Sequence, residues 1–365
     1  MQIFFKGLNE LRAIAALAVV AHHIELFKFR DSQASMFSTF FEFFISHVGK
    51  NGVYLFFVLS GFLITYLLLQ EKKNNETISI KKFYLRRVFR IWPLYYLIIA
   101  ISFILIPYLA SNFEIFTEIP YYYNKITNPD NYSLSTLSYY LLFMPNVALY
   151  LKQGVVGSSQ AWSVGVEEQF YILWPLLLLF FSKWRLPIVF LGIIIAMPVF
   201  AYFVAPIFSF EYMSIGALGA FGLFYFPSII EKFIKKNKYL YLIIILAILV
   251  LMSVQFTPYY IQSIVLSVLF IGLILTTVIG DESRIFKSRT LSFLGRISYG
   301  IYMYHPFIMF LMFPLANRYF QSNIIIFNLF LYILIPGISI LVSHLSYKYF
   351  ELPFIKIKDT KFKTL

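Results

Sequence analysis

The sequence has no cysteine and few charged residues. Of its 365 residues, only 13% are Asp, Glu, Lys or Arg. The absence of cysteine excludes disulfide bonds, thiolate metal sites and cysteine nucleophiles, and it leaves the redox compartment undetermined. The low charge excludes an ordinary water-soluble enzyme, in which about a quarter of the residues are charged. Disorder is also excluded, because 60% of the residues are hydrophobic and 21% are aromatic. The composition is that of a multi-pass membrane protein.

Long apolar stretches provide the second observation. Each is close to the roughly 20 residues that an α-helix needs to cross a bilayer. They predict an all-α integral membrane protein with about ten transmembrane helices, at about 8–27, 49–69, 89–110, 161–181, 187–206, 208–227, 239–256, 260–279, 291–313 and 324–347. A further apolar stretch, 136–151, is short and contains Pro145, so we expect it to be re-entrant or interfacial.

Acidic residues are scarcer than basic ones, with 17 against 30, and the net charge is +13. In a soluble protein this excess would suggest nucleic acid as a partner. Here a cytoplasmic N-terminus puts most of the basic residues inside, as the positive-inside rule requires. Those left outside are Lys28, Arg30, Lys50, Lys125, Lys152 and Arg318. We therefore expect both termini in the cytoplasm, a location in the cytoplasmic (inner) membrane, and no nucleic-acid partner.

The chain shows no internal repeat and no soluble appendage, which predicts a single membrane domain over residues 1–365. Its start resembles a signal peptide only superficially, because Arg12 and the pair His22 and His23 interrupt the apolar run. We interpret this segment as a retained first helix.

Ionisable side chains inside predicted spans are costly, and each is a candidate functional residue. The candidates are Arg12, His22, His23, Glu167, Glu168, Glu211 and His305. Arg12 and His23 are eleven residues apart and share one helix face, roughly 16 Å apart along the axis. Counting 1.5 Å per residue also puts His23, Glu167 and His305 at one depth in the outer third of the membrane. That depth is our predicted catalytic layer.

Structural roles compete with these functional ones. His22 and His23 could simply reach the headgroups, and Glu167 and Glu168 could form a hydrogen-bonded pair. His305 precedes Pro306 and could satisfy a carbonyl that the proline leaves free. Glu211 could be a boundary residue. No cluster of metal-ligand type is predicted.

A basic cluster, Arg86, Arg87 and Arg90, precedes the third predicted span on the cytoplasmic side, and Arg296 enters the ninth span from the same side. Anionic lipid and the positive-inside rule explain such a cluster. Arginine also offers a planar fork that binds phosphate oxygens, so these residues are candidates for a phosphate-rich ligand.

Five segments in order resemble the acyltransferase 3 family, the multi-pass membrane acyltransferases that modify saccharides and other hydroxyl acceptors. They are LNELRAIAALAVVAHH (8–23), GVYLFFVLSGFLIT (52–65), FYLRRVFRIWPLYYL (83–97), WSVGVEEQFYILWP (162–175) and ISYGIYMYHP (297–306). By this resemblance, Arg12 and His23 correspond to a family motif in which ten residues separate an arginine from a histidine. Arg87 and Arg90 correspond to its arginine pair, and Glu167 to its carboxylate.

The resemblance implies an acyl group, most commonly acetyl, drawn from cytoplasmic acyl-CoA and delivered to a saccharide or lipid-linked glycan at the outer side. No permanently bound cofactor is implied. We expect no extracytoplasmic domain after the last helix, and we therefore expect the membrane part to act alone or to pass its product to a partner of polysaccharide assembly.

From these residues we predict His23 as the general base, oriented by Glu167, with acyl-CoA held by Arg12, Arg86, Arg87, Arg90 and Arg296. Direct transfer and an acyl-histidine relay both stay open. The secondary candidates near the substrate are Glu168, His305, Glu211, Ser60 and Tyr302. For Ser60 we favour a hydrogen bond within its own helix over a place in the ligand tunnel.

Two other functions compete with acyl transfer. A transporter or flippase of a lipid-linked sugar, or of a small acyl-bearing molecule, could use the same buried charges as a pathway. A haem protein could use His23 and His305 as axial ligands.

Overall fold

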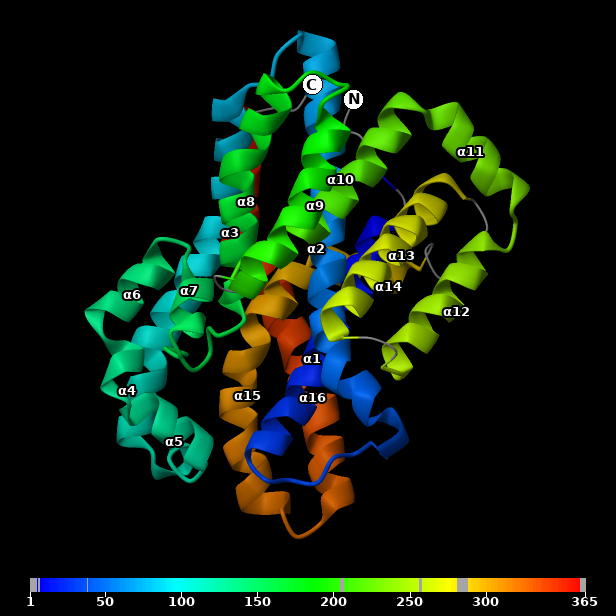
Figure 1. The fold of residues 1–365 in the computed structure, drawn as a ribbon. Helices are drawn as coiled ribbons and strands as arrows, with labels where there is room; N and C mark the ends of the chain where they lie inside the picture. Colours follow the sequence, from blue (N-terminus) through cyan, green and yellow to red (C-terminus); the bar gives the residue numbers. More distant parts are fainter. Residues whose placement is uncertain are drawn as a thin grey trace.

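The computed structural model describes residues 5, 7–37, 39–203, 207–255, 258–280 and 288–361, and in these ranges the chain forms helices and no strand. The long helices pack into one bundle, while α4, α5 and α6 lie together on one side of it (Figure 1). The α-helices are α1 (Leu8–Arg30), α2 (Thr39–Asn75), α3 (Ile80–Ala100), α4 (Ile106–Asn112), α5 (Pro120–Thr127), α6 (Leu134–Leu141), α7 (Pro145–Tyr150), α8 (Ala161–Phe180), α9 (Leu186–Phe203), α10 (Phe210–Tyr225), α11 (Pro227–Lys236), α12 (Leu240–Ser253), α13 (Tyr259–Ile279), α14 (Arg289–Arg296), α15 (Ser298–Phe320), α16 (Ile324–Ser346) and α17 (Leu352–Lys361).

In the described ranges each predicted span overlaps at least one helix, but the structure supports fewer spans than ten. Within the described ranges, seven helices are long and apolar enough to cross a membrane, which makes this a multi-pass membrane protein. The spans at α1, α10 and α12 stay predictions. Helix α1 carries several charges, α10 is bent by 100° against α11, and α12 has 14 residues. The cytoplasmic position of the termini and the single domain also stay predictions.

The predicted helix at 291–313 is wrong as one continuous element. It is broken at Ile297, where φ is −100° and ψ is 8°, so α14 ends at Arg296 and α15 begins at Ser298. Helix α14 turns aside to pack on α1, and Gly295 lies so close to the backbone of Asn9 that a Cβ atom would overlap it. The stretch 136–151 is divided between α6 and α7, with α7 beginning at Pro145 as expected from its fixed φ.

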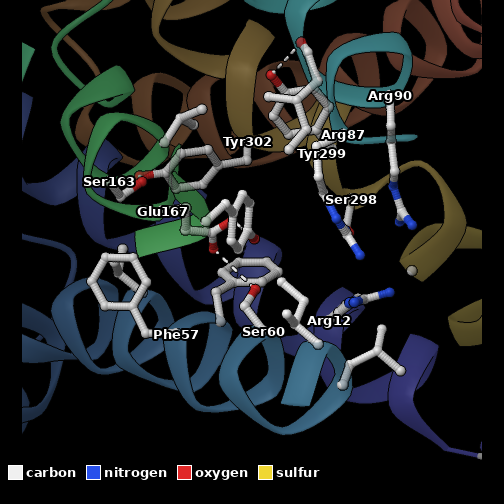
Figure 2. Close-up of a pocket in the computed structure, with 18 of the residues that line it drawn as sticks. Arg12, Phe57, Ser60, Arg87, Arg90, Ser163, Glu167, Ser298, Tyr299 and Tyr302 are labelled. Atoms are coloured by element: carbon white, nitrogen blue, oxygen red, sulfur yellow. Dashed lines mark hydrogen bonds between the residues drawn. The ribbon is translucent and has the colours of Figure 1, made fainter. Parts of the chain in front are cut away.

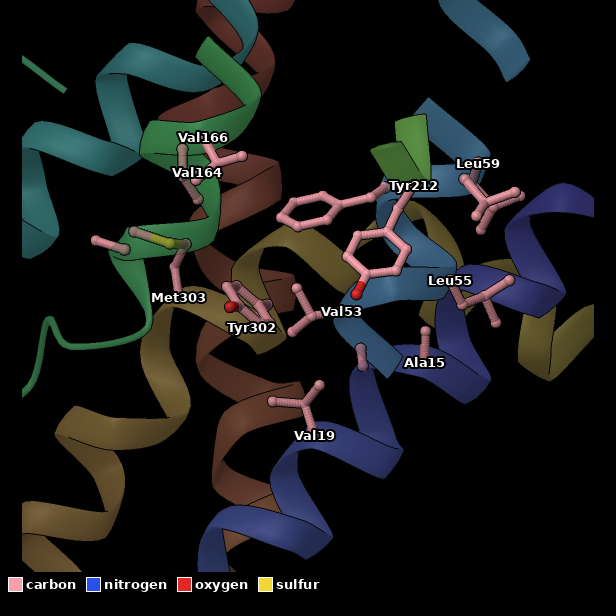
Figure 3. Close-up of a cluster of buried hydrophobic side chains, with 14 of the residues drawn as sticks. Ala15, Val19, Val53, Leu55, Leu59, Val164, Val166, Tyr212, Tyr302 and Met303 are labelled. Atoms are coloured by element: carbon pink, nitrogen blue, oxygen red, sulfur yellow. The ribbon is translucent and has the colours of Figure 1, made fainter. Parts of the chain in front are cut away.

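Small residues set the closest helix crossing of the bundle. Gly61 of α2 faces the backbone of Met213, and Gly216 of α10 faces the carbonyl of Val58, with no room for a Cβ at either glycine. In a bilayer, lipid tails are as apolar as the protein interior, so helices associate through close van der Waals packing of this kind. Figure 3 shows the buried side chains beside this crossing, contributed by α1, α2, α8, α10 and α15.

A buried network of hydrogen bonds joins the last turns of α1 to α16. Lys28 is fully buried and donates to Glu25 (2.7 Å) and to Asn328 (2.6 Å). Glu25 also accepts from Tyr332 (2.8 Å) and from Ser35 (2.6 Å). The buried charge is therefore both paired and hydrogen-bonded, which is the condition for keeping an ion away from water.

Candidate functional site

A cavity of about 110 Å³ lies where α1, α2, α3, α8 and the α14–α15 break meet. Four guanidinium groups line it, together with Glu167, which is the one carboxylate among the described lining residues. Figure 2 shows Arg12, Arg87, Arg90 and Glu167 around the cavity. Its polar lining residues are Arg12, Arg87, Arg90, Arg296, Ser60, Ser163, Ser298, Glu167, Tyr171, Tyr299 and Tyr302. The lining therefore carries a clear excess of positive charge.

The arginines form one end of this cavity. Arg90 and Arg296 are exposed, so this end opens to the surface, whereas Arg12 and Arg87 are half-buried. The Arg87 guanidinium packs on the ring of Tyr171 (5.4 Å to the centroid), and its Nε is buried without a hydrogen-bond partner. A buried donor without an acceptor is costly unless a ligand satisfies it. The arginine end thus fits an anionic group.

Arg86 does not join the other arginines. Its guanidinium is ion-paired with Glu71 at 3.2 Å, and it does not line the cavity. The sequence cluster Arg86, Arg87 and Arg90 is thus divided by the helical rotation of about 100° per residue.

The start of α15 adds to the positive end. Ser298 and Tyr299, in the first turn of this 23-residue helix, line the cavity beside Arg296. The first N–H groups of a helix lack partners within the helix and carry partial positive charge. The break at Ile297 therefore turns a helix N-terminus towards the cavity.

The opposite end of the cavity carries hydroxyl and carboxylate groups (Figure 2). Glu167 accepts hydrogen bonds from Ser60 (3.1 Å) and Tyr171 (2.6 Å). Ser163 and Tyr302 are both buried, and their oxygens lie 2.7 Å apart. Our preference for a Ser60 bond within its own helix is wrong, because Ser60 reaches across to Glu167 and lines the cavity.

The two candidate histidines are in direct contact. Nδ1 of His23 lies 2.6 Å from Nε2 of His305, and the ring planes are nearly parallel (13°) with their centroids 4.9 Å apart, so the two rings meet edge to edge. The Nδ1 atom of His305 lies 3.2 Å from the carbonyl oxygen of Ile301. Tyr302, which lines the cavity, has its ring 5.9 Å from that of His305, so it connects the cavity to the histidine pair.

Two expectations about this pair are wrong. Among the described residues Glu167 hydrogen-bonds Ser60 and Tyr171, so it does not orient His23. Haem ligation by His23 and His305 does not fit either, because axial ligands stand on opposite faces of a haem, and these nitrogens contact each other.

His23 and His305 are not among the described residues that line the cavity, and the remaining candidates also lie outside it. Glu168 accepts from the Trp92 indole (3.2 Å), and Glu211 accepts from Tyr260 (3.4 Å). His22 bonds the carbonyl of Ile45 (2.8 Å) instead of reaching out of the bundle. In the described ranges, no group of three or more His, Asp or Glu side chains is placed to hold a metal ion.

Sequence reasoning missed several lining residues. Ser163, Tyr171, Ser298 and Tyr299 are neutral, and in an apolar span a hydroxyl residue is as often bonded to its own helix as to a ligand. One signal was available, because Ser163 and Tyr171 lie four residues on either side of Glu167, and residues four apart share a helix face.

Comparison with known proteins agrees with the segments noted in the sequence. The peptidoglycan O-acetyltransferase OatA of Listeria monocytogenes is 27% identical over 384 residues, which cover 97% of this chain and 56% of that protein. Candidate O-acetyltransferases of Staphylococcus aureus are 23% identical over 379 residues, covering 97% of this chain and 58% of their own. The chain thus spans little more than half the length of these relatives. No solved structure matches it.

The family comparison covers nearly the whole chain. The acyltransferase domain of the acyltransferase 3 family matches residues 5–345, a range that contains the cavity, the histidine pair and all five sequence segments. The chain therefore belongs to the acyltransferase 3 family.

Proposed function

We propose that this protein is a membrane O-acetyltransferase that moves an acyl group from cytoplasmic acyl-CoA to a hydroxyl of a cell-surface saccharide or lipid-linked glycan at the outer side. The observation that carries the proposal is the cavity, whose described lining has arginines at one end and the Glu167 carboxylate at the other. The relatives named as O-acetyltransferases support the acetyl group, and the Listeria protein supports peptidoglycan as one acceptor class.

The arginine end would bind the phosphates of the donor. The cavity opens beside Arg90 and Arg296, which are exposed, so the nucleotide part of coenzyme A would lie at this end. Guanidinium groups bind phosphate oxygens through paired hydrogen bonds, and the N-terminus of α15 adds to the attraction. Arg12, Arg87, Arg90 and Arg296 would share this role.

His23 would act as the general base. A hydroxyl of the acceptor gives its proton to His23 while its oxygen attacks the thioester carbonyl carbon. The carbon–sulfur bond then breaks, and the leaving thiolate recovers the proton from His23. The products are an ester on the acceptor and a free thiol of coenzyme A. Because His23 is half-buried and His305 is completely buried, His23 is the one of the two that a substrate can approach.

The testing experiment supplies membranes that contain native glycans with acetyl-CoA labelled in the acetyl group. Wild type should move label into the glycan or lipid fraction, and His23→Ala should lose transfer while still binding coenzyme A. His22→Ala is the matched control, since this neighbouring histidine bonds the backbone of α2, and it should keep transfer.

Two outcomes would overturn this proposal. Equal transfer by wild type and His23→Ala would remove His23 as the base. The absence of both transfer and thiol release, with other acyl donors also tried, would favour a transporter of a lipid-linked sugar.

A further inference from the structure

The histidine pair contains a fixed order of hydrogen-bond donors and acceptors. We infer that His305 is a positioning residue that holds His23 in the tautomer whose Nε2 atom is unprotonated, and thereby makes Nε2 the basic atom of the reaction. The inference rests on the proposed function for the role of His23, but the order of protons follows from contacts alone.

The order starts at a backbone carbonyl. The carbonyl oxygen of Ile301 can only accept a hydrogen bond, so Nδ1 of His305, 3.2 Å away, must carry the proton. A neutral imidazole has one N–H and one lone pair, so Nε2 of His305 is an acceptor. His23 Nδ1 lies 2.6 Å from that acceptor and must be the donor. The remaining nitrogen of His23, Nε2, therefore has a free lone pair.

The helix around Pro306 supports the buried end of this chain of bonds. Proline has no N–H, so Pro306 cannot bond the carbonyl of Tyr302, four residues before it, and that free carbonyl lies next to the Ile301 carbonyl that the His305 ring contacts. His305 thus satisfies the helix backbone, as one reading of the sequence expects, and it bonds His23 in addition. With 0% of its surface exposed, its ring cannot exchange Ile301 for a water molecule.

The arrangement differs from a serine-protease triad in one respect. In that triad a carboxylate accepts a hydrogen bond from the Nδ1–H group of the catalytic histidine, and its negative charge stabilises the imidazolium ion that forms during the reaction. Here the acceptor is a neutral imidazole, so the proton that His23 gains at Nε2 gives the pair a single positive charge, which the bond from His23 Nδ1 to His305 Nε2 spreads over two rings. When Nε2 returns the proton to the leaving thiolate, the pair is neutral again.

The tautomer can be measured without any acetyl transfer. Two-bond ¹⁵N–¹H correlations of the ¹⁵N-histidine-labelled full chain in detergent at neutral pH identify the protonated nitrogen of each ring, and the His23→Ala spectrum assigns the His23 signals. The expected result is His23 protonated at Nδ1 and free at Nε2. A wild-type spectrum with His23 protonated at Nε2 would overturn the inference whether or not the protein transfers acetyl groups.

Two substitutions separate positioning from structure. His305→Phe keeps an aromatic ring but removes the acceptor, so kcat should fall by about 100-fold, a loss typical of a misplaced catalytic group, with KM for acetyl-CoA little changed. His305→Gln offers an amide oxygen to His23 Nδ1–H and should recover most of that loss. His47→Phe, on the outer part of α2, is the matched control and should keep the wild-type kcat.

An unchanged kcat in His305→Phe would contradict the inference. Equal losses of kcat in His305→Phe and His305→Gln would also contradict it. If residue 305 only filled space, a side chain that accepts a hydrogen bond from His23 would restore no more activity than one that does not. If His305→Phe fails to fold, the tautomer of His23 in the wild-type spectrum and the kcat of His305→Gln still test the inference.

Discussion

Arg86 and Arg87 are consecutive residues of α3 with different partners. Arg86 is ion-paired with Glu71 on the side of α2, whereas Arg87 lines the cavity with a buried Nε that lacks a hydrogen-bond partner. The two residues have the same chemistry and differ only in the direction that the helix gives them. They therefore form a natural pair for testing the anion site.

Arg87→Ala should weaken the binding of coenzyme A by about 10- to 100-fold, because a hydrogen bond to a charged group contributes about 1.5–3 kcal/mol. Arg86→Ala should leave the affinity nearly unchanged. Isothermal titration of the detergent-solubilised protein measures both. Equal losses in the two variants would indicate a diffuse basic surface instead of a defined site.

Glu167→Gln should tighten the binding of coenzyme A by about two- to tenfold, because the cavity loses the carboxylate that repels phosphates. Glu168→Gln is the control, since Glu168 bonds Trp92 outside the cavity. The same titration compares them. Weaker binding in Glu167→Gln would mean that the carboxylate holds the lining in its binding conformation.

Gly216→Ala should destabilise the bundle by about 1–3 kcal/mol, the usual cost of overpacking, because the new methyl group overlaps the carbonyl of Val58. Gly337→Ala, at a helix position with open space around its Cβ, should stabilise by about 0.5–1 kcal/mol. Thermal unfolding in detergent, followed by circular dichroism, distinguishes these opposite signs. A neutral Gly216→Ala would show that α2 and α10 can separate at little cost.

Lys28→Met should lower the free energy of unfolding by about 3–5 kcal/mol, because it leaves the Glu25 carboxylate buried without its cation. Lys235→Met removes a lysine from an exposed pair with Glu231 and should cost less than about 1 kcal/mol. Unfolding by titration with SDS gives both values. Similar small costs would mean that water reaches Glu25 in the folded protein.

Most of the long helices could be predicted from the sequence, because crossing a bilayer requires long apolar runs. The break at Ile297 could not, since its residues are compatible with a helix and the turn depends on the packing of α14 against α1. Local patterns do not encode such tertiary contacts.

The contact between the two histidines agrees with their predicted common level along the helices, but the direction of the Glu167 side chain could not be predicted. Counting residues along each helix put His23, Glu167 and His305 at one level, and the structure joins His23 to His305. It turns Glu167 instead towards Ser60 and Tyr171. The rotation of α8 about its axis decides this, and that rotation is set by packing against several helices at once.

Helix α1 is held at both ends. Its first turn lies against Gly295 of α14, and its last turns are fastened to α16 through Lys28 and Asn328. A helix fixed in this way sets a constant distance between Arg12 and His23, which is roughly 16 Å along the helix axis at 1.5 Å per residue. A donor in which the anionic group and the thioester are closer together than this would bind the arginines and stop short of the histidine, so the protein would select its acyl donor by length.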